Sequence, residues 1–255
     1  MPKHSPEPRL TAAIRQEIYR RAGEELKEVD LLKPRFADEG SPALRLAPLI
    51  LTKHSDSAGS TPESQEARVV WYLSTSQVIR GVEHQQWTYF WQRPRTAERD
   101  RSWQGVRITL NSAGDPAIWE VLNDSSGAEL IWVVQSLEIA AAKEFGQALP
   151  GRVCSVEPAI ADAGRVIVPD VVDDGPTPMG PILYTEPNGD VRAVACRCSA
   201  TQAESLRKQG FYTLQATTAA VAKEKMGSGN RLHKGSAPWF SSGRLESSLR
   251  LPKTF

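Results

Sequence analysis

Residues 181–209 read PILYTEPNGDVRAVACRCSATQAESLRKQ and predict a strand, a tight turn, a second strand and a helix in succession. Residues 182–184 and 191–195 are rich in β-favouring side chains. Between them, Asn188-Gly189 supplies the positive φ angles that a tight hairpin turn needs, and Pro187 presets φ just before it. This stretch therefore predicts a β-hairpin.

Two cysteines stand at the joint between the second strand and the helix. Ser199 and Gln202 have the capping-box spacing, which predicts that the helix begins at Ser199. Because Cys196 and Cys198 are two apart on a strand, they point to the same face. Cys198 also lies beside the helix N-terminus, where unpaired N–H groups and the helix dipole favour a thiolate.

This pair suggests a thiol or thiolate–metal site. Cys196 and Cys198 would act as ligands of a soft metal such as zinc or iron, or as a nucleophile with its resolving partner. His84 lies in a predicted strand and Cys154 in another, so both are candidate further ligands of a His/Cys site with one open position, as catalytic zinc uses. The alternative is that the cysteines are small buried hydrophobes and that His84 is buried and hydrogen-bonded.

The composition is that of an ordinary globular protein. The chain has 255 residues, a formal net charge of +1 and three cysteines. We expect a cytoplasmic protein with reduced thiols, because three cysteines make no disulfide framework and neither a signal-peptide core nor a membrane-length apolar run occurs. The near-neutral charge does not favour nucleic acid as a partner.

The middle of the chain predicts an antiparallel meander followed by the main helix. β-rich segments joined by short turn-rich links are typical of such a meander. The predicted strands are residues 68–75, 83–91, 105–110, 117–122 and 128–135. Ser136 then stands as the N-cap of a helix over residues 137–149.

Outside the meander and the hairpin the expected elements are short. Residues 31–36 read as irregular, and Pro48 argues against a regular helix or central strand over 43–51. Further short strands are expected at 152–156, 165–168 and 211–214.

The expected fold class is α+β, with an antiparallel sheet of five or more strands packed by one main helix, then a β-hairpin–helix unit and a disordered C-terminal tail. The expected domains are an N-terminal tail and docking helix (1–41), a single α+β domain (42–215), and a weak helix with a flexible basic tail (216–255).

A second hypothesis is a non-catalytic binding or assembly protein. Residues 227–255 are rich in Gly, Ser and Pro and carry mostly basic charges, so this tail could contact a protein partner. The aromatic sheet face formed by Trp87, Tyr89 and Trp91 would provide the second contact surface. Aromatic rows at period two also occur in cores, so this pattern alone does not separate the two uses.

Carboxylates near strand ends are weaker candidates. Two of them on one site bind a hard metal or share acid–base work. The helix dipole accounts for Glu138, and turn chemistry accounts for Asp173 and Asp174. The full set is Glu120, Glu138, Glu157, Asp170, Asp173 and Asp174. The sequence contains no P-loop, no Gly-x-Gly-x-x-Gly, no His-Glu-x-x-His and no Gly-x-Ser-x-Gly motif.

Overall fold

The computed structural model describes ten stretches of the chain. They are residues 29–35, 41–53, 68–93, 103–122, 129–159, 166–174, 180–186, 189–195, 208–227 and 244–255. The predicted N-terminal docking helix and most of the predicted helix after Cys198 lie outside these stretches. The last two residues of the latter prediction, 208 and 209, instead belong to the strand Lys208–Ala216.

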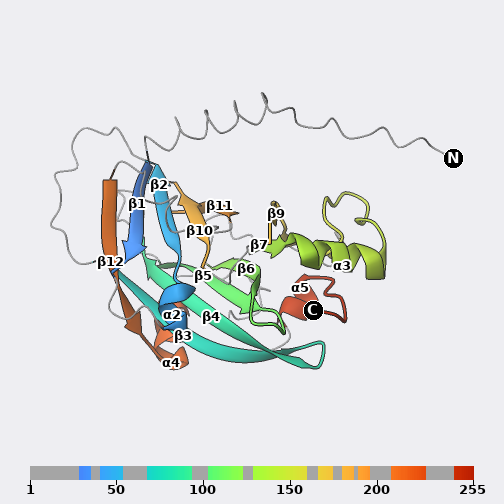
Figure 1. Cartoon of the computed structure of the whole chain (residues 1–255), viewed down its shortest axis with the longest axis horizontal. Helices are drawn as coiled ribbons and strands as arrows, with labels where there is room; N and C mark the ends of the chain where they lie inside the picture. The colour runs from blue at the N-terminus through green and yellow to red at the C-terminus, as the bar shows by residue number, and fades with distance from the viewer. Residues whose placement is uncertain are drawn as a thin grey trace.

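The described residues form one 12-stranded sheet, in the order β11-β10-β2-β1-β12-β3-β4-β5-β6-β7-β8, with β9 also paired to β7 (Figure 1). The strands are β1 Val29–Pro34, β2 Leu49–Lys53, β3 Arg68–Ile79, β4 Val82–Gln92, β5 Trp103–Leu110, β6 Pro116–Leu122, β7 Glu129–Val134, β8 Val166–Ile167, β9 Val171–Val172, β10 Ile182–Thr185, β11 Val191–Ala195 and β12 Lys208–Ala216. The described helices are α2 Pro42–Arg45, α3 Gln135–Phe145, α4 Ala219–Gly227 and α5 Arg244–Ser248.

The prediction of an antiparallel α+β sheet packed by one main helix is wrong. The sheet is mixed: β12 lies between β1 and β3 and runs parallel to both, and β10 runs parallel to β2. It is also curled, and α3 lies beside β7 and β9 rather than across the sheet (Figure 1). These parallel pairs join segments far apart in the sequence, so no local turn signal reveals them.

The meander itself is confirmed. Strands β3 to β7 pair antiparallel in sequence order. The turn between β3 and β4 is tight because Arg80 and Gly81 both have positive φ, 53° and 84°. The hairpin of β10 and β11 is confirmed as well, with Gly189 at a φ of 87°.

Residues 29–35 and 41–53 are more regular than their sequence indicates. β1 is a strand between β2 and β12, although residues 31–36 read as irregular. Pro48 does not interrupt a strand; it immediately precedes β2, where its missing N–H is harmless. Its carbonyl accepts a hydrogen bond from the Tyr212 hydroxyl at 2.6 Å. The expectation of no regular element over 43–51 was therefore wrong.

Helix α3 exists but has different ends from those predicted. Its N-cap is Val134, and the carboxylate of Asp174 accepts hydrogen bonds from the Ser136 N–H at 2.9 Å and its hydroxyl at 2.5 Å. A carboxylate 38 residues away thus supplies the cap expected from Ser136 itself. The helix ends at Gly146, whose φ is 83°. Residues 152–156, predicted as a strand, form a loop.

The meander of β3 to β7 has two faces, and side chains of β4 and the residue after it join the meander to distant parts of the chain. We call inner the face that carries Tyr89 and the buried residues paired with it across the sheet. The Tyr89 hydroxyl donates to the carbonyl of Ala43 beside it at 2.7 Å. Arg93, directly after β4, forms a 2.7 Å ion pair with Asp190 of the β10–β11 hairpin. These contacts hold distant parts of the sheet together. The opposite face is called outer.

The inner face is the main core. The register places two adjacent cross-strand rows of large apolar residues on it. Their buried members are Trp87, Tyr89, Val106, Ile108, Trp119, Val121 and Trp132. Trp87 and Tyr89 therefore belong to the core and do not present the contact surface that the second hypothesis requires.

The prediction of a disordered C-terminal tail is wrong for residues 244–255. α5 and the segment after it pack against the sheet beside α3 (Figure 1). The backbone N–H of Arg250 donates to the Val156 carbonyl at 2.7 Å, and that of Lys253 donates to the Glu144 carboxylate at 2.8 Å. The apolar side chains that anchor this segment are Leu245, Leu249, Leu251 and Phe255. Such spaced anchors outweigh the polar composition around them.

Candidate functional site

A row of buried polar side chains crosses the outer face of β4, β5 and β6. The pairing register places alternate residues of these strands side by side on this face. Its members, none more than 3% exposed, are His84, Gln86, Thr88, Arg107, Thr109 and Glu120. A buried polar group left without a partner costs roughly 1–3 kcal/mol, so the partner of each group is informative. We call this set the buried polar row.

The centre of the row is an ion pair. Arg107 and Glu120 stand at directly paired positions of β5 and β6. The Arg107 Nε donates to Glu120 Oε2 and its Nη2 to Oε1, both at 2.6 Å. This two-bonded geometry is the strong form of the arginine–carboxylate pair. The charges are therefore compensated inside the fold.

His84 stands at one end of the row. Only one of its two ring nitrogens has a hydrogen-bond partner among the described residues. Its Nδ1 lies 2.9 Å from the carbonyl oxygen of Leu110. A carbonyl oxygen only accepts, so Nδ1 carries the hydrogen, and the neutral ring then has its lone pair on Nε2. Nε2 is buried and has no hydrogen-bond partner within the described part of the chain. The Nε2 atom of His84 is therefore a hydrogen-bond acceptor that no described group uses.

Gln77 of β3 lies directly across from His84 on the same face. Its amide Nε2 is likewise buried with no hydrogen-bond partner among the described residues. Gln86, two residues after His84, is satisfied, because its Nε2 donates to the Thr109 hydroxyl at 3.0 Å. On this face of the meander, the unused groups among the described residues are thus an acceptor on His84 and a donor on Gln77.

The C-terminal segment covers this pair from one side. The ring of Phe255 stacks on the ring of His84 with centroids 4.5 Å apart and an interplanar angle of 5°. Stacking occupies the ring face, whereas the Nε2 lone pair lies in the ring plane. The hydroxyl of Ser248 donates to the Glu129 carboxylate at 2.9 Å and fixes the start of the same segment.

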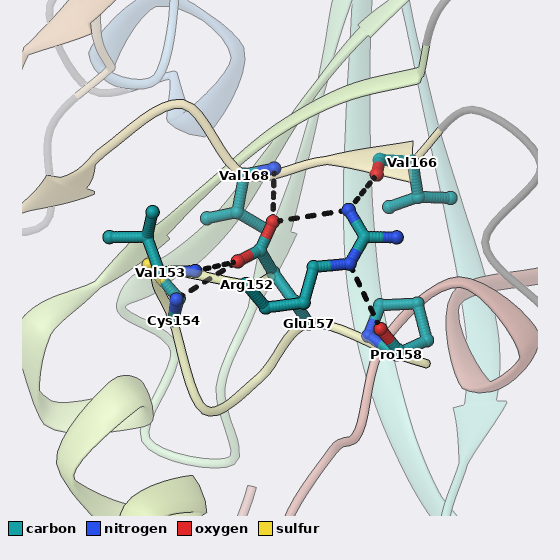
Figure 2. Close-up of polar contacts among 7 residues, drawn as sticks. All are labelled: Arg152, Val153, Cys154, Glu157, Pro158, Val166 and Val168. Atoms are coloured by element: carbon teal, nitrogen blue, oxygen red, sulfur yellow. Dashed lines mark hydrogen bonds and ion pairs between the residues drawn. The ribbon is translucent and has the colours of Figure 1, made fainter. Parts of the chain in front are cut away.

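Cys154 lies in the loop after α3, next to a buried carboxylate. Figure 2 shows the Glu157 carboxylate between the loop backbone, Val168 and the guanidinium of Arg152. It accepts the backbone N–H of Val153 at 2.8 Å and of Cys154 at 2.9 Å. These bonds give Glu157 the role of holding the loop in place.

The surroundings of Cys154 oppose ionisation of its thiol. Burial, followed by the negative charges of Glu138, Glu157 and Asp170, raises the pKa of the Cys154 thiol to about 11. Metals and electrophiles react with the thiolate, so a thiol with a raised pKa is a poor ligand and nucleophile. These surroundings do not favour Cys154 as the further metal ligand that the sequence suggested.

Of the remaining predicted site residues, the structure describes His84 but not the two cysteines that follow β11. Cys196 and Cys198 lie outside the described residues, so their thiol or metal site stays a prediction. No group of three or more His, Cys, Asp and Glu side chains in the described stretches is arranged to hold a metal ion. Within the described part of the chain, His84 contacts Leu110 and Phe255, and no hydrogen bond joins it to Cys154.

The sequence contained part of the signal for the buried polar row. The alternation in β4 places His84, Gln86 and Thr88 on one face. A row of polar side chains on one face of a strand normally indicates that this face is exposed to solvent. Their burial depends on segments packed over the outer face. Gln77 and the Arg107–Glu120 pair require the cross-strand register, which the sequence alone does not supply.

No family model, no curated protein and no solved structure matches this chain. Among the described residues, no helix has both the length and the apolar character that crossing a membrane requires.

Proposed function

We propose that this protein binds a small molecule through a planar amide-type group at the His84–Gln77 pair. The observation that carries the proposal is the Nε2 atom of His84, which is buried and without a partner among the described residues while Nδ1 is fixed by Leu110. A carboxamide, urea, lactam or nucleobase edge presents a donor and an acceptor side by side. Such an edge would satisfy Nε2 of His84 and Nε2 of Gln77 together.

The energetics support a ligand at this position. Each unpaired buried group costs the fold roughly 1–3 kcal/mol, and a ligand that pairs both groups recovers that cost on binding. Sites built to hydrogen-bond a particular polar group also reject analogues that lack it. The neighbouring Arg107–Glu120 and Gln86–Thr109 pairs are already satisfied, so they support the site rather than compete for the ligand.

The test is ligand-observed NMR with acetamide, urea and uracil as probes on the full chain. His84→Asn keeps a donor toward the Leu110 carbonyl but removes the acceptor at Nε2, and Gln77→Met removes the amide at similar length. We expect binding of at least one probe to the unmodified protein and its loss in both variants. Gln85→Met is the matched control, because Gln85 is exposed and bonds Ser74. Equal binding to all four proteins, or to none, would contradict the proposal.

A second proposed function is a thiol or thiolate–metal site at Cys196 and Cys198. It is favoured by one observation, that β11 ends at Ala195, so the cysteine pair directly follows an established hairpin strand. Zinc or iron would be the metal. A cytoplasmic location with reduced thiols is part of this proposal and is supported by the low cysteine content.

A further inference from the structure

Two tryptophans form a corner on the outer face, far from the His84–Gln77 pair. Trp71 of β3 and Trp103 of β5 lie on either side of Phe90 of β4, six residues and about 20 Å along the strand from His84. The two indole rings are nearly perpendicular, with centroids 5.2 Å apart and an interplanar angle of 73°. We call this pair the Trp71–Trp103 corner.

A glycine makes the corner possible. Gly105 is paired with Phe90, and a Cβ at position 105 would lie 2.7 Å from the Tyr89 carbonyl oxygen and 3.0 Å from Phe90 Cβ. Because no side chain occupies that position, the Phe90 ring packs against both tryptophans. It stacks on Trp71 with centroids 6.0 Å apart and meets Trp103 edge-on at 5.6 Å. The corner therefore has a firm aromatic base.

A cation from the chain itself occupies the corner. The Nζ of Lys225 lies 4.9 Å from the Trp71 ring centroid and 5.1 Å from that of Trp103. Lys225 belongs to α4, which docks through Ala222, fully buried against this aromatic cluster. Residues three apart share a helix face, so the docked Ala222 directs Lys225 onto the rings. One ammonium thus contacts two ring faces.

We infer that the Trp71–Trp103 corner is a binding site for a quaternary methylammonium group, and that Lys225 is an internal occupant which the ligand displaces. Perpendicular aromatic rings around a cation are the arrangement that recognises quaternary ammonium. A lysine ammonium is compact and strongly hydrated, so it loses much hydration against a ring. A methylated ammonium has an apolar surface and loses less.

Helix α4 buries few of its own side chains. Among its residues 219–225, whose side chains the structure describes, Ala222 alone is buried and Lys225 is half-buried. Val221 is 38% exposed. Moving α4 outward therefore exposes few apolar side chains of the helix itself. The inference does not depend on the His84–Gln77 pair, and either can fail without the other.

The experiment titrates tetramethylammonium into the full chain and follows the indole N–H NMR signals of Trp71 and Trp103, assigned with Trp71→Phe and Trp103→Phe. Lys225→Gln removes the competing charge and keeps much of the stem. We expect saturable shifts of both signals, with a Kd at least about tenfold lower in Lys225→Gln than in the unmodified chain, equivalent to about 1.4 kcal/mol. Sodium chloride at equal ionic strength sets the baseline.

Lys223→Gln is the matched control, because Lys223 lies on the exposed side of the same helix and its loss changes the net charge equally. It should bind the probe like the unmodified chain. Lys225→Met, with an uncharged stem, should reproduce the gain, and Trp71→Leu combined with Lys225→Gln should abolish it. Absence of a saturable shift in both Lys225 variants, or an equal gain in Lys223→Gln, would overturn the inference.

Discussion

The two faces of the meander are built from the same strands but bury different kinds of side chain. The inner face is closed by large apolar side chains such as Tyr89 and Trp132, both of which are buried. The outer face buries histidine, arginine and glutamate side chains at adjacent positions, again almost completely. A buried apolar side chain needs no hydrogen-bond partner, whereas a buried polar group is stable only where it is paired. The inner face is not purely apolar, because the indole N–H groups of Trp87 and Trp119 are buried without a partner among the described residues.

The comparison shows where function is expected. On the outer face Arg107 and Glu120 satisfy each other, and Gln86 bonds Thr109. Only the His84–Gln77 pair retains unused buried groups among the described members of this face. A residue placed against local packing rules with no compensation inside the fold is expected at a functional site.

The largest effect is expected on the inner face. Trp132→Ala should lower the free energy of unfolding by about 3–5 kcal/mol, because it removes a large side chain from a closed core. Trp71→Ala on the outer face, where the ring is half-buried, should cost clearly less. Urea denaturation of both variants measures the difference. Equal losses would mean that the two faces do not differ in packing.

The next prediction concerns the stability that the buried Arg107–Glu120 ion pair contributes. Arg107→Met should destabilise the protein by about 3–5 kcal/mol, because it leaves the buried Glu120 carboxylate without its main partner. The double variant Arg107→Met/Glu120→Met should regain a substantial part of that loss. Chemical denaturation of the unmodified, single and double variants gives the coupling energy. A coupling energy near zero would show that the pair is not a unit.

A smaller effect concerns pH and Cys154. Folding raises the pKa of this thiol from 9.0 to about 11, so the folded state holds the proton more tightly than the unfolded state. The stabilisation is complete below about pH 9 and is lost as the pH rises through about 11, an effect of roughly 1–3 kcal/mol. Cys154→Ala should flatten the fall in stability over this range.

The control for this prediction lies in the other groups that titrate at high pH. Burial also raises the pKa of Tyr184, but that contribution is common to both proteins and cancels in the difference. Thermal unfolding between pH 8 and pH 11 gives the measurement. Identical pH profiles for the unmodified protein and Cys154→Ala would refute the role of the thiol.

Replacing Cys196 and Cys198 is expected to change the stability of the protein least. The same replacement is the most direct test of the thiol site. Elemental analysis should find zinc or iron in the purified protein, or else native thiol titration should find a fast-reacting cysteine that Cys154→Ala retains. The double variant Cys196→Ser/Cys198→Ser should lose either signal. Unchanged metal content and thiol reactivity in that variant would end the proposal.

Local patterns predicted local structure well. The Asn188-Gly189 turn and the alternation in β3 to β7 were sufficient for the hairpin and the meander, because both depend on neighbours in sequence. The parallel placement of β12 between β1 and β3 depends on contacts between distant segments, and the cap of α3 by Asp174 does so as well. Such contacts leave no periodic signal.

The candidate site shows the same limit. His84 was recognised from the sequence as the histidine within a strand, but with cysteines as its expected partners. Its described neighbours are Leu110, Gln77 and Phe255, which come from a paired strand, a hairpin partner and the C-terminal segment. Phe255 read as part of a polar tail, and its burial could be found only once the outer face was known.

The most direct test of the central claim is a long-range nitrogen–proton NMR spectrum of the His84 ring in the full chain, recorded without and with a saturating planar amide such as acetamide or uracil. We expect Nδ1 to be protonated and Nε2 to have the shift of an unbonded lone pair in the free protein. On addition of the probe, the Nε2 shift should move toward that of a hydrogen-bonded acceptor, and the same probe should cause no such change in Gln77→Met. A hydrogen on Nε2 in the free protein, or an Nε2 shift that no planar amide changes, would contradict the proposed site.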